Sequence, residues 1–278
     1  MKLQIKNAFI VLVTLITAMS CSVEERMAAN FVMANNTRSI LVFPAEFIFK
    51  VNQKKEILDS LKITDESKFD SVLYVHSDYL QHLNDSLFLA NYTLGYKQEM
   101  TALGFRVYDQ NETQAFLEVD TNAYVANIAQ IEVEETLYDY RAGQNIYGHY
   151  YYYDFLLNAI VVNSWIELKK VDDNGKGEQM YFATDIITDD FEGDFHADVF
   201  AGQMRFVYNI DTLQVDALYN FAFLLGRKYA SYTMDMLLNK YLDANVPAGK
   251  RSETYWRFDP YRKDFFPEEE NKFIPMGE

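Results

Sequence analysis

Few residues in this chain combine a reactive side chain with the spacing that a catalytic or metal site needs. The four histidines lie at positions 76, 82, 149 and 196, and no two of them have the helical or strand spacing of metal ligands. An HExxH zinc motif, a G-x-S-x-G nucleophile elbow and a glycine-rich phosphate loop are all missing from the sequence. The sequence therefore predicts a protein without a catalytic centre, a bound metal or a cofactor.

Acidic side chains gather in one stretch around Phe191, Phe195 and His196. Its acids are Asp189, Asp190, Glu192, Asp194 and Asp198. Paired carboxylates can act as acid and base in glycoside hydrolysis, or they can bind Ca²⁺. A solvated acidic loop accounts for the same composition and is the interpretation that we prefer. The question of a metal at 189–198 stays open at this stage.

A shorter acidic stretch, Asp172-Asp173-Asn174-Gly175, resembles part of a calcium-binding loop. Lys170, however, occupies the position where the first ligand of such a loop would be. Asn-Gly is also the strongest short signal for a hairpin turn in this chain. We therefore expect a hairpin here, with arms at 157–169 and 179–187.

Tyrosines dominate the segment from 147 to 154, which reads YGHYYYYD. They are Tyr147, Tyr150, Tyr151, Tyr152 and Tyr153. Aromatic rings in such a cluster can stack on sugar rings, which makes this segment a candidate glycan contact. The same rings also pack well as cross-strand pairs on a half-exposed sheet, and structural packing is the simpler interpretation.

Cys21 is the only cysteine, and it directly follows a segment with the features of a targeting signal. Lys2 and Lys6 give this segment a basic start, and residues 8–18 are apolar except for two threonines. An apolar stretch of this length is too short to span a bilayer as a stable helix. Residues 1–20 are therefore predicted to be a signal peptide.

The position of Cys21 resembles the lipobox of bacterial lipoproteins, in which the cysteine thiol is diacylated and becomes the first residue of the mature chain. Ala18 replaces the leucine that usually lies three places before that cysteine. The competing interpretation is an ordinary signal peptide followed by an unrelated cysteine. Glu24 and Glu25 resemble the acidic export signal of surface lipoproteins in Bacteroidetes, although a solvated linker could contain the same acids. The lipobox resemblance implies a lipid-anchored outer-membrane protein, on the periplasmic face or at the cell surface.

The net charge limits the possible partners. The chain has 41 acidic and 25 basic residues, a formal charge of −16, and loss of the two lysines in residues 1–20 would make it −18. Nucleic acid needs a basic face that releases its counterions, and anionic lipid attracts basic segments, so both are excluded as electrostatic partners. Membrane attachment is therefore predicted to depend on lipid at Cys21.

Strand and helix patterns alternate through the chain. Strands are predicted at 39–44, 71–75, 105–108, 124–138, 157–169, 179–187 and 204–210, and helices at 54–61, 78–103, 112–118 and from 218 to before Pro247. The last helix has the clearest apolar stripe, opposite a polar face that includes Arg227 and Asp235. The apolar face predicted for 78–103 consists of Leu80, Leu83, Leu87, Leu94 and Met100. These patterns predict an α/β fold, or α+β as a variant, with one central mixed sheet flanked by helices.

The chain divides into four predicted regions. They are a signal peptide at 1–20, a tether at 21–37, the α/β domain at 38–249 and an extended tail at 250–278. The tail contains seven aromatic residues, and its prolines exclude a continuous helix. We expect the tail to lie extended on its own domain and to bury its rings there, with acids 268–270 in solvent.

Several segments resemble a small α/β domain shared by exported bacterial lipoproteins. The segments are SILVFP at 39–44, the long helix, GFRVYD at 104–109, a second helix and NAYVANIAQ at 122–130. The group includes the curli secretion lipoprotein and the outer-membrane lipoprotein activators of penicillin-binding proteins. The resemblance covers about a third of the chain and includes no chemically specific residue. It implies a protein that binds or gates other envelope proteins.

These observations together predict a non-enzymatic outer-membrane lipoprotein that contacts proteins of the cell envelope. Two alternatives remain: a surface lipoprotein that binds glycans through the tyrosines, and a glycosidase with an acid pair near 189–198. An exposed row of tyrosine rings beside a groove would favour glycan binding. A cleft with two carboxylates about 5 to 10 Å apart would favour hydrolysis.

Overall fold

A computed structural model describes residues 23–34, 38–119, 122–171, 179–198, 203–247, 249–252, 254–268 and 272–276. The strands are β1 Ser39–Phe43, β2 Ile48–Asn52, β3 Arg106–Asp109, β4 Ala123–Ile146, β5 His149–Lys170, β6 Gln179–Thr188, β7 Asp190–Asp198, β8 Gln203–Asp211, β9 Tyr255–Asp259, β10 Asp264–Glu268 and β11 Ile274–Met276. The α-helices are α2 Val23–Met33, α3 Glu56–Leu61, α4 Phe69–Val75, α5 Asp85–Ala102, α6 Thr113–Leu117 and α7 Val215–Asn245. Short 3₁₀ turns lie at Glu66–Lys68 and Gln110–Glu112.

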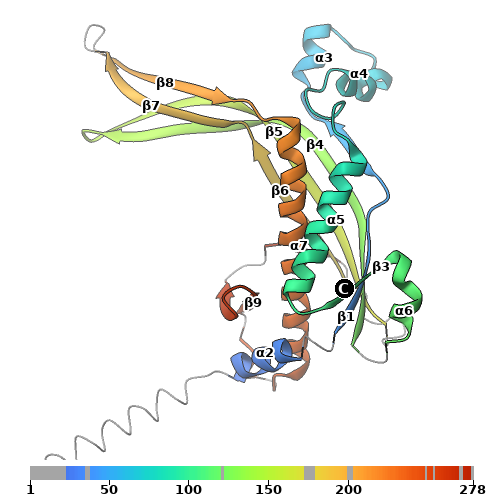
Figure 1. The fold of residues 1–278 in the computed structure, drawn as a ribbon. Coiled ribbons are helices and arrows are strands. Elements are labelled where there is room, and N and C mark those ends of the chain that lie inside the picture. Colours follow the sequence, from blue (N-terminus) through green and yellow to red (C-terminus); the bar gives the residue numbers. More distant parts are fainter. Residues whose placement is uncertain are drawn as a thin grey trace, which may run out of the picture.

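The centre of the molecule is a mixed sheet of seven strands (Figure 1). Its order is β11-β6-β5-β4-β1-β3, and β2 also pairs with β4. β1 and β2 run parallel to β4, whereas β4, β5 and β6 form an antiparallel series. This architecture confirms the predicted α/β class with one mixed sheet and flanking helices.

β4 and β5 are much longer than the sequence predicted. They pair from Tyr124 opposite Lys170 to Ile146 opposite His149, whereas β6 stops at Thr188, opposite Ala159. The last part of the β4–β5 hairpin therefore continues as a two-stranded ribbon after the sheet has ended. This ribbon projects from the body of the molecule (Figure 1).

α5 and α7 cover one face of the sheet and cross each other very closely. The α7 stripe is buried as predicted, at Leu218, Ala222, Leu225, Tyr229 and Tyr232 among others. At the crossing, a Cβ on Gly95 would collide with the backbone carbonyl of Phe223, and one on Gly226 with that of Tyr92. Glycine on both helices is therefore what lets the two backbones approach.

One predicted element before this crossing is wrong, and a second starts later than predicted. Residues 71–75, predicted as a strand, belong to helix α4, whose Leu73 is buried and accepts a 2.8 Å hydrogen bond from Asn52 through its carbonyl. α5 starts at Asp85 and not at residue 78, because the Asn84 side chain accepts the Leu87 N–H at 3.1 Å and caps the helix. The apolar pattern indicated neither the contact of Asn52 with Leu73, 21 residues away, nor the local cap at Asn84.

The predicted apolar face of α5 is also wrong in part. Leu87 and Leu94 are exposed, whereas the buried face contains Phe88, Tyr92, Tyr96 and Met100. The helix is rotated so that Gly95 faces α7, and the residues on that side are mostly aromatic. Close backbone approach, and not leucine burial, therefore sets the orientation of this helix.

Most of the predicted tether is an ordered helix. α2 packs on the C-terminal part of α7 (Figure 1), and its Ala28 and Phe31 belong to the main core. Glu24, expected in solvent, is buried and accepts hydrogen bonds from Ser252 N at 2.6 Å, Arg251 Nη1 at 3.0 Å and Trp256 Nε1 at 3.3 Å. A solvated linker is therefore the wrong description of 23–33, because Glu24 ties this segment to the C-terminal tail.

The tail packs on its own domain, as predicted, but as strands and not as a continuous extended segment. β9 and β10 form a hairpin, of which β9 lies against α7, and β11 adds to the edge of β6. Trp256, Phe258 and Phe273 are buried in the main core. The predicted boundaries at 38 and 250 therefore separate segments that share one core.

Arg257 on β9 binds two acids that the sequence analysis wrongly placed in solvent. Asp235, predicted on the polar face of α7, is buried and accepts hydrogen bonds from Arg257 Nε at 2.8 Å and Phe258 N at 3.2 Å. Burial raises the pKa of Asp235 to about 6, although the charge and hydrogen bond of Arg257 oppose that rise. Glu268, predicted in solvent, accepts from Arg257 Nη1 at 3.3 Å. The guanidinium of Arg257 therefore forms ion pairs with one acid from α7 and one from β10.

We predict that Gly95→Ala destabilises the domain by about 1–3 kcal/mol, a typical cost of overpacking. The added methyl group meets the backbone of α7, which cannot yield without moving the helix. This loss opposes the gain in helix propensity that alanine normally brings. Urea unfolding measures the difference. Leu94→Ala, an exposed neighbour, serves as control and should stay within about 0.5 kcal/mol of wild type. An unchanged or higher unfolding midpoint for Gly95→Ala would contradict the close crossing.

We also predict a pH-dependent role for Glu24. Burial raises the pKa of this carboxyl, but hydrogen bonds from Ser252, Arg251 and Trp256 outweigh burial, so the pKa lies below its ordinary value. A lowered folded-state pKa means that ionised Glu24 stabilises the fold above the unfolded-state pKa. This contribution is lost as the pH falls through the folded-state pKa.

Glu24→Gln should therefore lower the free energy of unfolding by about 1–3 kcal/mol at pH 7. The loss should shrink below about pH 4, where carboxyl groups take up protons. Urea unfolding at pH 7 and below about pH 4 measures this loss in the free energy of unfolding. Glu118→Gln, at an exposed position, should leave the free energy of unfolding unchanged at either pH. Equal losses for Glu24→Gln at the two pH values would show that its charge has no part in the contact.

Candidate functional site

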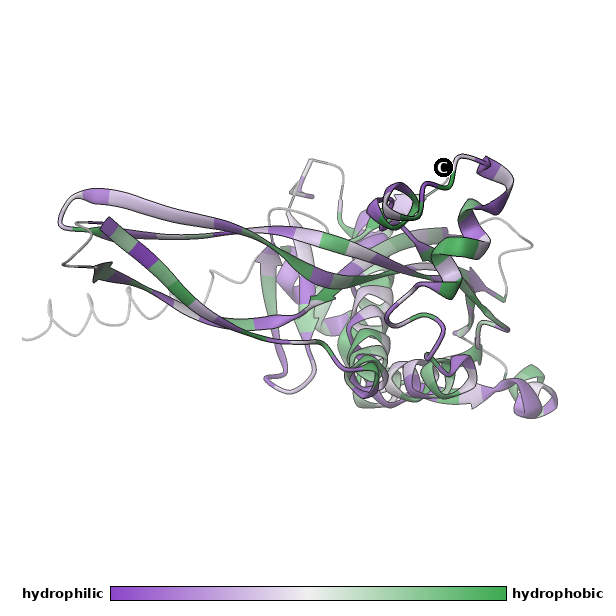
Figure 2. Ribbon diagram, turned by 90° about the horizontal axis from the view of Figure 1, so that it is seen from above, coloured by the Kyte–Doolittle hydropathy of each residue, from purple (hydrophilic) through white to green (hydrophobic). Residues whose placement is uncertain are grey.

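The most distinctive feature of the structure is a projecting arm. It consists of residues 139–156 of the β4–β5 hairpin and of the β7–β8 hairpin, which run side by side away from the helices (Figures 1 and 2). Aromatic rings fill the space between the two ribbons. The ring centroid of Phe155 lies 4.8 Å from that of Phe191 and 5.5 Å from that of Tyr208. Tyr153 lies 5.3 Å from Phe206 by the same measure. These ring contacts join the two ribbons, although Tyr153 and Tyr208 remain 38% and 41% exposed.

The five predicted tyrosines divide between the two faces of the arm. Tyr151 and Tyr153 pack inward, on Phe195 and Phe206. Tyr150 and Tyr152 point outward, because successive residues of a strand alternate between faces. Tyr147 forms the turn at the tip, with a positive φ of 49° and 99% of its surface exposed. Structural packing thus explains two of the five, and three are available to a partner.

Tyr150 and Tyr152 form an exposed pair of rings with an ion pair beside it. Their rings stack with a centroid separation of 6.4 Å and an interplanar angle of 25°. The guanidinium of Arg141 lies 4.5 Å from the Tyr152 ring and binds Asp154 through two hydrogen bonds of 2.6 and 2.9 Å. The Arg141 hydrogen bond keeps the pKa of Asp154 below its usual value, so this carboxylate is charged. Flat rings beside fixed charges form a surface suited to recognition. We call Tyr150, Tyr152, Arg141 and Asp154 together the platform.

The acidic stretch 189–198 is mostly strand β7, and the prediction of a loop is wrong. Glu192 and Asp194 are exposed on the outer face of the ribbon, while Phe191 and Phe195 are half-buried against Phe155 and Phe206. Asp189 is buried and accepts from the backbone N–H of Asn158 and Leu213, both at 2.8 Å. Asp198 lies at the end of the described strand, and its side chain is outside the description. No group of three or more potential metal ligands occurs among the described residues.

A buried polar junction joins the arm to the body, and sequence reasoning missed it. Glu135 of β4 is fully buried, forms a 2.9 Å ion pair with Lys54 and accepts from the backbone N–H groups of Asp78, Tyr79 and Leu80. Lys54 also donates to Asn158 Oδ1 at 2.9 Å, and Asn158 Nδ2 donates to Asp189 at 2.9 Å. A signal existed in the sequence, because Glu135 continues the inward-facing series of Ile131 and Val133.

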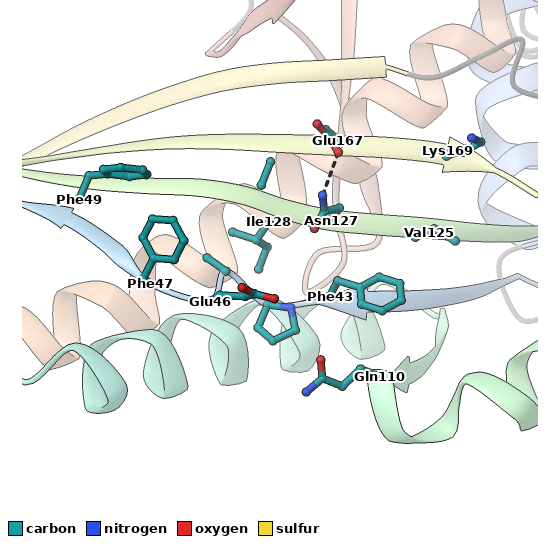
Figure 3. Close-up of a pocket in the computed structure, with 13 residues that line it drawn as sticks. Phe43, Glu46, Phe47, Phe49, Gln110, Val125, Asn127, Ile128, Glu167 and Lys169 are labelled. Atoms are coloured by element: carbon teal, nitrogen blue, oxygen red, sulfur yellow. Dashed lines mark hydrogen bonds between the residues drawn. The ribbon is translucent and has the colours of Figure 1, made fainter.

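A groove of about 860 Å³ runs along the other face of the sheet (Figure 3). Phe43, Phe47 and Phe49 line one side of it, and Glu167 lies across from them, where it accepts a 2.8 Å hydrogen bond from Asn127. None of the predicted tyrosines or acids lines this groove. The predicted glycan contact is therefore exposed but does not border this groove.

Other predicted positions add no site. Cys21 and the stretch 172–175 lie outside the described residues, so the lipid attachment and the hairpin turn stay predictions. The arms predicted on either side of that turn are confirmed as β5 and β6. His76, His82, His149 and His196 are all exposed.

Comparison of the chain with protein-family models, curated proteins and solved structures found no match. Among the described residues, no helix has the length and apolar composition to cross a membrane. The resemblance to exported α/β lipoproteins therefore stays a prediction from the segments that carry it.

Proposed function

We propose that this protein is a lipid-anchored, non-enzymatic lipoprotein of the outer membrane that contacts protein partners of the cell envelope through its arm. The observation that carries the proposal is the arm itself, a projection whose two ribbons are joined by aromatic contacts and which has an exposed platform at its outer face. Tyrosine and arginine are enriched at the centres of protein interfaces, because they combine large contact area with hydrogen bonding. Both residue types meet on the platform.

The placement of the arm relative to the N-terminal region supports this proposal. α7 begins just after β8, at the root of the arm, and its C-terminal part packs on α2 (Figure 1). A helix of 31 residues is about 45 Å long. Only Ser22 separates Cys21 from the first residue of α2. A lipid on Cys21 would thus hold the body next to the bilayer, with the root of the arm about 45 Å from α2.

The polar groups at the base of the arm favour binding over catalysis. Glu135 and Asp189 are buried, and each is bonded to several backbone N–H groups of neighbouring segments. A carboxylate held in this way stabilises the junction of several elements.

Glycan binding is the second candidate function, and the exposed platform favours it. Tyr150 and Tyr152 present two nearly parallel rings beside Arg141 and Asp154, an arrangement that could stack on a sugar and bond to its hydroxyl groups. The glycosidase hypothesis gains no comparable support, because Glu192 and Asp194 lie exposed on the outer face of a two-stranded ribbon.

The anchor is tested by Cys21→Ser. We expect the full-length variant to leave the membrane fraction, because the charge of the chain offers no electrostatic hold on anionic lipid. Detergent-free fractionation of cells measures this, and wild type serves as the reference. A variant that still sediments with membranes would refute the lipid anchor at Cys21.

The role of the arm is tested by the double variant Tyr150→Ser/Tyr152→Ser. Partner binding should weaken by about tenfold or more, as for loss of interface hot spots, while thermal melting stays unchanged. Affinity capture from solubilised envelopes, followed by titration with each captured partner, measures the effect. Leu87→Ser/Leu94→Ser on α5 is a matched control, since these side chains are 45% and 48% exposed and the tyrosines 60% and 57%.

Equal capture by the platform variant and the α5 control would contradict the proposed role of the arm. Loss of a bound envelope polysaccharide, with protein capture unchanged, would favour the glycan-binding alternative. Photo-crosslinking from position 150, compared with position 94, gives an independent check in intact cells.

A further inference from the structure

The face of the sheet that lies opposite α5 and α7 is covered at its two ends. At the β1–β3 end, Phe116 of α6 packs on Tyr108, with ring centroids 5.6 Å apart. At the arm, the β7–β8 hairpin packs on Phe155. β5 pairs with β4 without a register shift from Trp165 to His149, so Phe155 and Trp165 point to the same face. The part of β2, β4, β5 and β6 between these two covers, which we call the open strip, borders the groove shown in Figure 3.

Two carboxylates occupy the middle of the open strip. Glu132 and Glu134 are two residues apart on β4 and therefore point to the same face. Both accept a hydrogen bond from the Nδ2 atom of Asn163 on β5, at 3.2 Å and 2.5 Å. Burial and the neighbouring Glu132 carboxylate raise the pKa of Glu134. The pair therefore places two like charges side by side, at a cost that a bound cation would reduce.

The described part of the chain supplies no cation to this pair. Both acids are bonded to the neutral amide of Asn163, and no described lysine or arginine forms an ion pair with either of them. Lys50 and Lys54, on and just after the adjacent strand β2, pair with acids of the opposite face. The described lining of the groove adds Glu46 and Glu167, against Lys169 alone. The open strip is therefore an acidic surface.

Aromatic rings lie on both sides of the acid pair. Phe47 and Phe49 have ring centroids 4.9 Å apart and are 56% and 43% exposed beside the groove (Figure 3). Trp165 and Phe182, on β5 and β6, have centroids 4.9 Å apart. The strand register places Phe49 beside Glu132, with β5 as the next strand. Exposed apolar groups rimmed by polar residues mark interaction sites. We call this surface the acid–aromatic face, and it consists of Phe47, Phe49, Glu132, Glu134, Trp165 and Phe182.

The charge of this face selects among its possible occupants. A guanidinium group pairs with carboxylates through parallel N–H bonds and also stacks on aromatic rings. A second copy of this chain, with a formal charge of −16, would bring like charge to the acid pair. An uncharged sugar would cover the rings but leave the two carboxylates without a cation. A basic side chain next to apolar ones is the occupant that matches both features.

We propose that the acid–aromatic face binds a protein segment in which arginine side chains alternate with apolar ones. The basic groups bind Glu132 and Glu134, and the apolar side chains lie in the groove at Phe47 and Phe49. The platform is separate from this surface, because its tyrosines point to the other face of the β4–β5 hairpin. The proposal depends neither on the arm nor on the lipid anchor, so each can be tested without the other.

The probe for this proposal is a capped pentapeptide with the sequence leucine-arginine-phenylalanine-arginine-leucine. Its control has citrulline in place of arginine, which keeps the shape and removes the charge. Isothermal titration calorimetry uses the full chain carrying Cys21→Ser. The arginine peptide should bind about tenfold or more tightly than the citrulline peptide, because only the former offsets the charge of the acid pair.

Variants of the protein locate the binding. Glu132→Gln/Glu134→Gln should weaken binding of the arginine peptide by about tenfold or more, without a lower melting temperature, because it removes the repulsion between the two acids. Glu192→Gln/Asp194→Asn is the matched control, since it removes two negative charges from exposed positions on the arm and should leave the affinity unchanged. The platform variant should also bind the peptide normally, whatever its effect on partners of the arm.

Four results would overturn the proposal. Equal affinities for the arginine and citrulline peptides would remove the role of charge. An equal loss of affinity in Glu132→Gln/Glu134→Gln and its matched control would assign binding to net charge alone. Binding of cellohexaose in place of the peptide would assign the face to glycans. A dimer in sedimentation experiments that Phe47→Ser/Phe49→Ser dissociates would assign it to a second copy of the chain.

Discussion

The antiparallel pairing of β4 with β5 is the contact on which the rest of the structure depends. It runs from Tyr124 and Lys170, inside the body, to Ile146 and His149 at the tip of the arm. Inside the body, this hairpin supports the helical layer and receives β1, β2 and β6 on its edges. Outside the body, the same two strands form half of the arm. One hairpin thus joins the body of the molecule to the tip of the arm, so a change in its register would displace both.

A long two-stranded ribbon is only marginally stable in water, and the protein supports this one in two ways. Along the arm, the β7–β8 hairpin packs on it through Phe155, Phe191 and Phe206. At the root, the buried Glu135 bonds to Lys54 and to successive backbone N–H groups, which fixes the loop before α5 against β4. A buried carboxylate is costly unless it is fully bonded, so its contacts specify one arrangement of these elements. The arm is therefore a structured projection, which is the property that a contact surface needs.

Both ends of the described chain are built into the body. Glu24 near the start bonds to Arg251 and Ser252, which are more than two hundred residues away, and Arg257 joins the tail to α7 through Asp235. The segment that follows Cys21 therefore belongs to the fold and does not act as a loose tether. Under the proposed lipid anchor, the body would lie next to the membrane, with the arm remote from α2 (Figure 1).

The sequence by itself determined the class of fold and most of its strands, because burial of one face gives strands and helices distinct apolar periods. It also indicated α7 in detail, since Leu218, Ala222 and Leu225 recur at helical spacing whatever they contact. Only the tertiary structure decided whether 71–75 became a helix, which tyrosines of the arm face inward, and that Asp235 and Glu24 are buried. Each of these depends on a partner distant in sequence: Asn52 for α4, β7–β8 for the tyrosines, and the tail for the two acids. Local patterns record whether a residue favours burial, but the identity of the group that buries it is set by packing between distant segments.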